Sequence, residues 1–77
     1  MEYILIFSNT HRALKCEEIL TKMSIKLNIV PVPTYITSSC GIGIAIYEED
    51  LKNSIKILEE KNISIKYIYD NINKKKL

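Results

Sequence analysis

The sequence predicts an α+β domain with the ferredoxin-like order β-α-β-β-α-β, in which two helices cover one face of a four-stranded antiparallel sheet. Two observations lead to this prediction. Apolar runs of strand length alternate with two stretches of helical periodicity in that order, and 77 residues are enough for one such domain. We expect the domain to span residues 1–70 and a lysine-rich flexible tail to follow over residues 71–77.

The chain begins with a predicted strand and helix. Residues 3–7 form a continuous apolar run of aromatic and β-branched type, which indicates a central strand buried on both faces. A helix should then start at one of three N-cap candidates and end near Ser24. The N-cap candidates are Ser8, Asn9 and Thr10. The apolar stripe of the helix contains Ala13, Cys16, Ile19, Leu20 and Met23.

Two strands separated by a loop follow this helix. Residues 26–30 alternate in polarity and predict a strand, and Pro31 and Pro33 place it at a sheet edge because proline cannot donate to a ladder. The chain resumes as a strand over residues 42–47, with Gly43 on the face opposite its isoleucines.

The second helix and the last strand complete the predicted domain. Acidic residues 48–50 suit a helix N-terminus, and Asn62 is a candidate for the residue just after the helix. The buried stripe of this helix should contain Leu51, Ser54, Ile55 and Leu58. Alternation over residues 63–69 then predicts a strand with Ile63, Ile65, Tyr67 and Tyr69 on one face.

Cys40 is the candidate reactive group. It follows the hydroxyl side chains of Ser38 and Ser39 and precedes Gly41, which we expect to let the backbone turn close to the sulfur. Such a loop suits a nucleophile, and it also suits a carrier of a persulfide or perselenide anion. A cysteine in a small domain can equally be a packed apolar residue.

The predicted topology adds a second segment to this site. A helix joins the first two strands, so they run parallel and their C-terminal ends lie at the same end of the sheet. Thr10, His11 and Arg12, at the start of the first helix, should therefore lie near Cys40. A helix N-terminus and nearby cations lower the pKa of a thiol and favour the thiolate. His11 can instead be a solvated residue of the first helical turn.

Cys16 has two interpretations. It lies in the apolar stripe of the first helix, which indicates a buried core thiol. Alternatively it resolves Cys40 in a thiol switch, which requires Cα atoms within about 7 Å.

Composition excludes several classes of protein. The net charge of +2 comes largely from the lysines at 74–76, so no basic face for nucleic acid is evident. No apolar run approaches the roughly 20 residues of a membrane span, and no signal peptide is apparent. Two cysteines and one histidine form neither a disulfide framework nor a zinc spacing. We expect a cytoplasmic protein with no metal, cofactor, nucleic acid or membrane partner.

The chain resembles the small bacterial putative selenium/sulfur carrier protein-like family over about residues 2–69. The resemblance rests on Phe-Ser-Asn-Thr-His-Arg-Ala-Leu at 7–14, Pro-Val-Pro at 31–33 and Ser-Ser-Cys-Gly at 38–41. It implies a compact domain in which Cys40 carries sulfur or selenium between donor and acceptor proteins. Thr34 departs from the family pattern, which has an arginine there, and Arg12 is a candidate substitute.

The leading hypothesis is therefore a chalcogen carrier, a protein substrate more than an enzyme, that uses Cys40. The alternative is a non-catalytic module that binds a small ligand or dimerises and in which the thiol is incidental. A homodimer through the helix-free face of the sheet is a further expectation.

Overall fold

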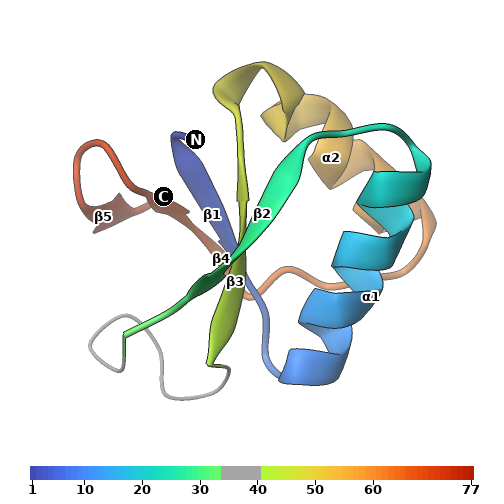
Figure 1. Ribbon diagram of the computed structural model, residues 1–77, viewed down its shortest axis with the longest axis horizontal. Helices are drawn as coiled ribbons and strands as arrows, with labels where there is room; N and C mark the ends of the chain where they lie inside the picture. Colours follow the sequence, from blue (N-terminus) through green and yellow to red (C-terminus); the bar gives the residue numbers. More distant parts are fainter. Residues whose placement is uncertain (34–40) are drawn as a thin grey trace.

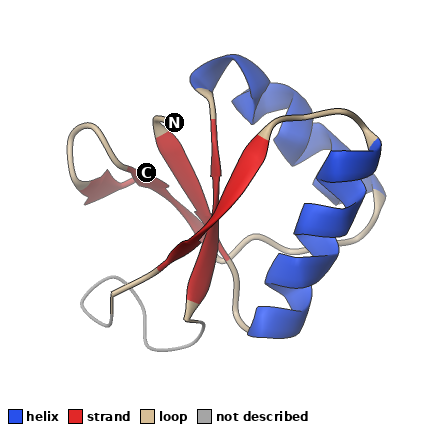
Figure 2. Ribbon diagram, viewed as in Figure 1, coloured by secondary structure: helices blue, strands red, loops and turns tan. Residues whose placement is uncertain are grey.

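A computed structural model describes residues 1–33 and 41–77 (Figure 1). Its elements are β1 (Tyr3–Ile6), α1 (Thr10–Lys22), β2 (Leu27–Pro31), β3 (Ile42–Ile46), α2 (Glu48–Glu60), β4 (Tyr67–Asp70) and β5 (Lys75–Lys76). Both helices lie on the same side of the sheet (Figure 2). The structure confirms a mixed α+β domain with two helices and an antiparallel sheet.

The sheet has the strand order β2-β3-β1-β4-β5, and every pair of neighbours is antiparallel. Leu5 of β1 pairs with Ile44 of β3, which in turn pairs with Ile29 of β2. Because β1 and β2 are both antiparallel to the strand between them, they are parallel to each other. Their C-terminal ends therefore lie at one end of the sheet, which we call the loop end. β2 is an edge strand that ends at Pro31, as the prolines predict.

The prediction of four strands was wrong, because the C-terminal residues add a fifth. Asp70 builds the turn before β5. Its Oδ1 accepts the N–H groups of Ile72 at 2.9 Å and Asn73 at 3.1 Å, and its Oδ2 accepts the Asn73 side-chain amide at 2.8 Å. These hydrogen bonds lower the pKa of the Asp70 carboxyl. β5 then pairs with β4, and the Lys76 ammonium lies 4.4 Å from the centre of the Tyr67 ring.

Polar residues determine where the helices begin and end. Asn9 is the N-cap of α1, and Ser24 and Asn62 adopt positive φ angles of 61° and 59° just after the two helices. The sequence predicted this position for Asn62. The N-terminus of α2 is capped from a distance, since the Glu2 carboxylate accepts the Glu48 N–H at 2.9 Å. That hydrogen bond lowers the pKa of Glu2.

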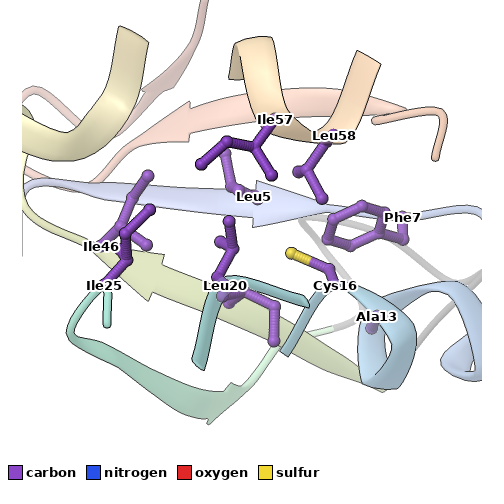
Figure 3. Packing of buried hydrophobic residues seen from close by; sticks show 10 residues of the cluster. Leu5, Phe7, Ala13, Cys16, Leu20, Ile25, Ile46, Ile57 and Leu58 are labelled. Atoms are coloured by element: carbon purple, nitrogen blue, oxygen red, sulfur yellow. The ribbon is translucent and has the colours of Figure 1, made fainter. Parts of the chain in front are cut away.

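The main core lies between the sheet and the helices (Figure 3). It contains Leu5, Phe7, Ala13, Cys16, Leu20, Ile25, Ile44, Ile46, Ile57 and Leu58. Two predicted members of the helical stripes were wrong. Met23 is 56% exposed because α1 ends one residue before it, and Ile57 is buried where Ile55 was expected.

The last strand is shorter than predicted, and its faces differ. β4 begins at Tyr67, while Ile63 and Ile65 precede the ladder and pack against the main core. Tyr67 and Tyr69 lie on the opposite face, with Ile6. The predicted common face was wrong because the strict alternation of side chains holds only within the paired strand.

The helix-free face of the sheet carries a second, smaller cluster. Ile6, Val32 and Tyr69 are less than 9% exposed there, and Ile4 and Tyr67 pack against them. Much of this apolar face is therefore already removed from water in the single chain.

Candidate functional site

The loop end of the sheet holds the start of α1 and the described residues on either side of positions 34–40. β1 leads into α1 there, and β3 starts there. A Cβ atom built on Gly43 would lie 3.3 Å from Ile6 Cδ1, which shows how closely the start of β3 approaches the end of β1. In Figure 1 the start of α1 and the ends of β2 and β3 that flank residues 34–40 lie at the bottom of the view.

The start of α1 presents exposed polar groups. Asn9 Oδ1 accepts the Arg12 N–H at 2.9 Å, and the Asn9 carbonyl accepts the Ala13 N–H at 3.3 Å. No acidic side chain occupies the first turn, and the side chains of His11 and Arg12 are exposed. Over residues 1–33 and 41–77, both ion pairs belong to Glu18, so no described carboxylate neutralises Arg12. An anion would be favoured beside this turn by the helix dipole and by one cation.

The residues on either side of positions 34–40 are held to each other by backbone pairing. Pro31 pairs with Ile42, and the Val32 N–H donates to the Gly41 carbonyl at 3.0 Å, which extends the β2–β3 ladder beyond the strands. Sequence reasoning ended this strand at Val30 and so missed Val32. The alternation of Val30 and Val32 on either side of Pro31 is the signal that identifies it.

Cys40 lies outside the described residues, together with Ser38, Ser39 and Thr34. The predicted approach of Cys40 to the start of α1 therefore remains a prediction. Of the other candidate residues, the structure places Thr10, His11 and Arg12 on the first turn of α1 and Gly41 next to β3, all at the loop end.

The two glycines of this segment differ in their surroundings. At Gly43 a Cβ atom would lie 2.6 Å from Ile4 Cγ2 and 2.9 Å from Val32 Cγ2, so the packing of the sheet face requires glycine. At Gly41 a Cβ atom would meet no atom of residues 1–33 or 41–77 within 4 Å. The expected role of Gly41 in letting the backbone turn close to the sulfur stays a prediction, because Cys40 lies outside the described residues.

Cys16 is a core residue. Its side chain is fully buried, and the sulfur points into the cluster beside Phe7 and Leu58 (Figure 3). Burial raises the pKa of the Cys16 thiol from 9.0 to about 12, with a smaller contribution from the negative charge of Glu17. Because the thiolate is the nucleophile, this thiol is inert near neutral pH. The core interpretation of Cys16 is the one that the structure supports.

A groove lies elsewhere, between the last half of α2 and β4. It has a volume of about 750 Å³ and an apolar side made by Ile55, Ile63, Ile65, Ile68 and Leu77, with Glu59, Asn62, Ser64, Lys66 and Tyr67 completing its lining. None of the residues predicted for the site lines it.

Metal ligands do not gather in the part of the chain that is described. No three side chains of His, Cys, Asp or Glu type cluster in a way that could hold an ion there. Neither helix has the length and apolar character that crossing a membrane demands.

Comparison with known protein families gives a match over most of the chain. A family model described as putative Se/S carrier protein-like matches residues 2–70 of the 77. No curated protein and no solved structure matches the chain significantly. The matched range contains Cys40, Gly41 and the start of α1.

Proposed function

Because the chain belongs to the putative Se/S carrier protein-like family, we propose that Cys40 carries sulfur or selenium and relays it from a donor protein to an acceptor protein. The observation that supports Cys40 most directly is the burial of the other cysteine. The chain has two cysteines, and the pKa of Cys16 is raised to about 12 in the core. Cys40 is then the cysteine whose thiol can react. The next residue in the chain, Gly41, lies at the loop end of the sheet.

The transfer needs no external oxidant. The Cys40 thiolate attacks the terminal sulfur of a cysteine persulfide on the donor. A new S–S bond forms to Cys40, the S–S bond within the donor breaks, and the donor cysteine leaves as a thiolate. The sulfane sulfur keeps its oxidation state, and Cys40 becomes the persulfide, whose terminal sulfur then loses its proton to water to give the anion. Transfer to the acceptor repeats the step with the roles exchanged, and a perselenide reacts in the same way.

Both the thiolate and the persulfide are anions, and the start of α1 supports their stabilisation. The helix dipole, the exposed Arg12 and His11, and the hydroxyl of Thr10 are proposed to act from α1. Ser38, Ser39 and the Gly41 N–H are proposed to act from the other segment. Arg12 would supply the cation that family members carry at the position of Thr34.

Loading with a cysteine desulfurase tests this function. After incubation with the desulfurase and L-cysteine, the intact mass of the wild-type protein should rise by one sulfur atom, and a reductant should remove the gain. The matched variants are Cys40→Ala, which should gain nothing, and Cys16→Ala, which should gain the sulfur. An equal gain in Cys40→Ala would rule out the carrier role of Cys40.

A binding module is the second candidate, and the groove along α2 favours it. This groove has a volume of about 750 Å³ and is lined in part by five aliphatic side chains, so it is large enough to accept a small molecule. In such a module the thiol plays no part. Loss of Cys40 would then leave ligand-dependent thermal stabilisation intact, while Ile65→Lys in the groove would abolish it.

Two further parts of the proposal concern assembly and location. A homodimer through the helix-free face would have to use Ile4, Val30 and Tyr67, since Ile6 and Tyr69 are already buried. Sedimentation would show whether a dimer forms and whether Tyr67→Lys dissociates it. The proposed location is the cytoplasm, and the order of β1 to β4 supports a ferredoxin-like arrangement.

A further inference from the structure

The backbone groups of β2 face either β3 or the outer edge of the sheet, and the strand register decides which. The Val32 N–H donates to the Gly41 carbonyl at 3.0 Å, so these two opposite residues form a hydrogen-bonded pair. Such pairs alternate with non-hydrogen-bonded pairs along an antiparallel ladder. Val30 and Gly43 therefore form the next hydrogen-bonded pair, and Pro31 lies at the non-hydrogen-bonded position between the two pairs. The N–H that proline lacks is thus one that would face outward.

The outer edge of β2 is open to another strand. Among the described strands β2 has only β3 as a neighbour. By the same alternation Leu27 and Ile29 direct their N–H and C=O groups outward, and Pro31 directs only a C=O group. Ile29 is 46% exposed and Pro31 is exposed as well, so this edge is accessible. Pro31 leaves the β2–β3 ladder intact and removes a donor from the open edge, where proline is known to block pairing with another chain.

The opposite edge of the sheet is closed in a different way. β5 pairs with β4 and is only 2 residues long, and both of these residues, Lys75 and Lys76, are exposed. Short edge strands and lysine side chains each discourage pairing with another chain. The two edges of the sheet therefore share this property, although different residues provide it.

A second copy of this chain is the partner that β2 would otherwise accept. In a symmetric antiparallel pair of β2 strands, each Ile29 lies opposite the same residue of the second copy, and the two exchange hydrogen bonds. Leu27 then lies opposite Pro31 of the second copy. The Leu27 N–H finds an acceptor there, but the Leu27 C=O finds no donor. This loss occurs once on each side of the symmetry axis, so Pro31 removes two hydrogen bonds and leaves two carbonyl groups unpaired.

We propose that Pro31 closes the β2 edge and so prevents two copies of this chain from joining their sheets edge to edge. The sheet then stays limited to the strands of one chain. This role of Pro31 is independent of the function of Cys40, since it depends on the register of β2 and on the exposure of its outer edge.

Sedimentation equilibrium of Pro31→Val and the wild type tests this role. Valine restores the outward N–H, so the dissociation constant of the dimer should fall about 30-fold, the equivalent of two hydrogen bonds. The matched control combines Pro31→Val with Ile29→Pro, which removes an outward N–H from the centre of the edge and spares the bonds to β3. This double variant should associate no more tightly than the wild type. Thermal unfolding checks that each variant is folded.

Amide hydrogen exchange identifies the surface that associates. In Pro31→Val the exchange of the Ile29 N–H should slow as the protein concentration rises, and in the wild type it should not change. A dissociation constant of Pro31→Val within about threefold of the wild-type value would overturn the role of Pro31. Concentration-dependent protection of the wild-type Ile29 amide would do the same, because the edge would already be paired. So would a tighter dimer of Pro31→Val whose Ile29 amide stays unprotected, because another surface would then associate.

Discussion

The contrast between the two cysteines gives the sharpest test of the structure. In Cys40→Ala the single remaining thiol is Cys16, and in Cys16→Ala it is Cys40. Burial raises the pKa of Cys16 from 9.0 to about 12, a difference of about three units. Each unit lowers the thiolate fraction tenfold, so Cys16 should react with iodoacetamide at pH 8 roughly 1,000-fold more slowly than a free thiol.

Intact-mass measurements over time follow this reaction. Cys40→Ala should stay unmodified while folded and react at the rate of a free thiol in urea. Cys16→Ala leaves a hole of about one methyl group, which costs roughly 1 kcal/mol, so it should remain folded as the matched control. Alkylation of native Cys40→Ala within tenfold of its rate in urea would refute the burial of Cys16.

The same burial predicts a loss of stability in alkali. Between pH 9.0 and 12 the unfolded state releases the Cys16 proton and the folded state keeps it, so the free energy of unfolding falls as pH rises. The slope should approach about 1.4 kcal/mol per pH unit between the two pKa values, and the loss from pH 9 to 10.5 should be about 1.6 kcal/mol. Urea unfolding should show this slope in the wild type and not in Cys16→Ala. Equal slopes would mean that other groups cause the alkaline loss.

Three further predictions concern the stability of the fold. Gly43→Ala forces a methyl group against Ile4 and Val32 and should lower the free energy of unfolding in urea by about 2 kcal/mol; no change would show that the face can relax. Ser54→Ala removes a buried hydroxyl that has no hydrogen-bond partner among the described residues, and it should raise that free energy by about 1 kcal/mol. Asp70→Asn should destabilise the protein most at pH 7 and progressively less as pH falls through the lowered pKa of Asp70, since the stability contributed by the carboxylate is present above its unfolded pKa and lost in acid. A pH-independent difference between Asp70→Asn and wild type would contradict that assignment.

Local patterns alone were sufficient for much of this fold. The N-cap of α1 is Asn9, one of the three predicted candidates, and Asn62 follows α2 as predicted; both depend on neighbouring residues in the chain. Proline has no N–H to donate to a neighbouring strand, so the prolines predict the position of β2 at the edge of the sheet. The parallel course of β1 and β2 follows from the helix between them, and it predicted that both candidate segments meet at one end of the sheet. The ferredoxin-like assignment and the approach of Cys40 to α1 remain predictions.

Tertiary structure decided the features that depend on partners distant in sequence. β5 forms because the edge of β4 is available for pairing and Asp70 can close the turn between the two strands. From composition alone, the residues of β5 are predicted to be part of a charged tail. The burial of Cys16, and with it the raised pKa, depends on Phe7, which follows β1, and on Leu58 of α2, which pack beside the sulfur in the core. The difference between Gly41 and Gly43 is of the same kind. Only the packed sheet shows that Ile4 and Val32 occupy the space beside Gly43, whereas no described residue comes within 4 Å of the equivalent space beside Gly41.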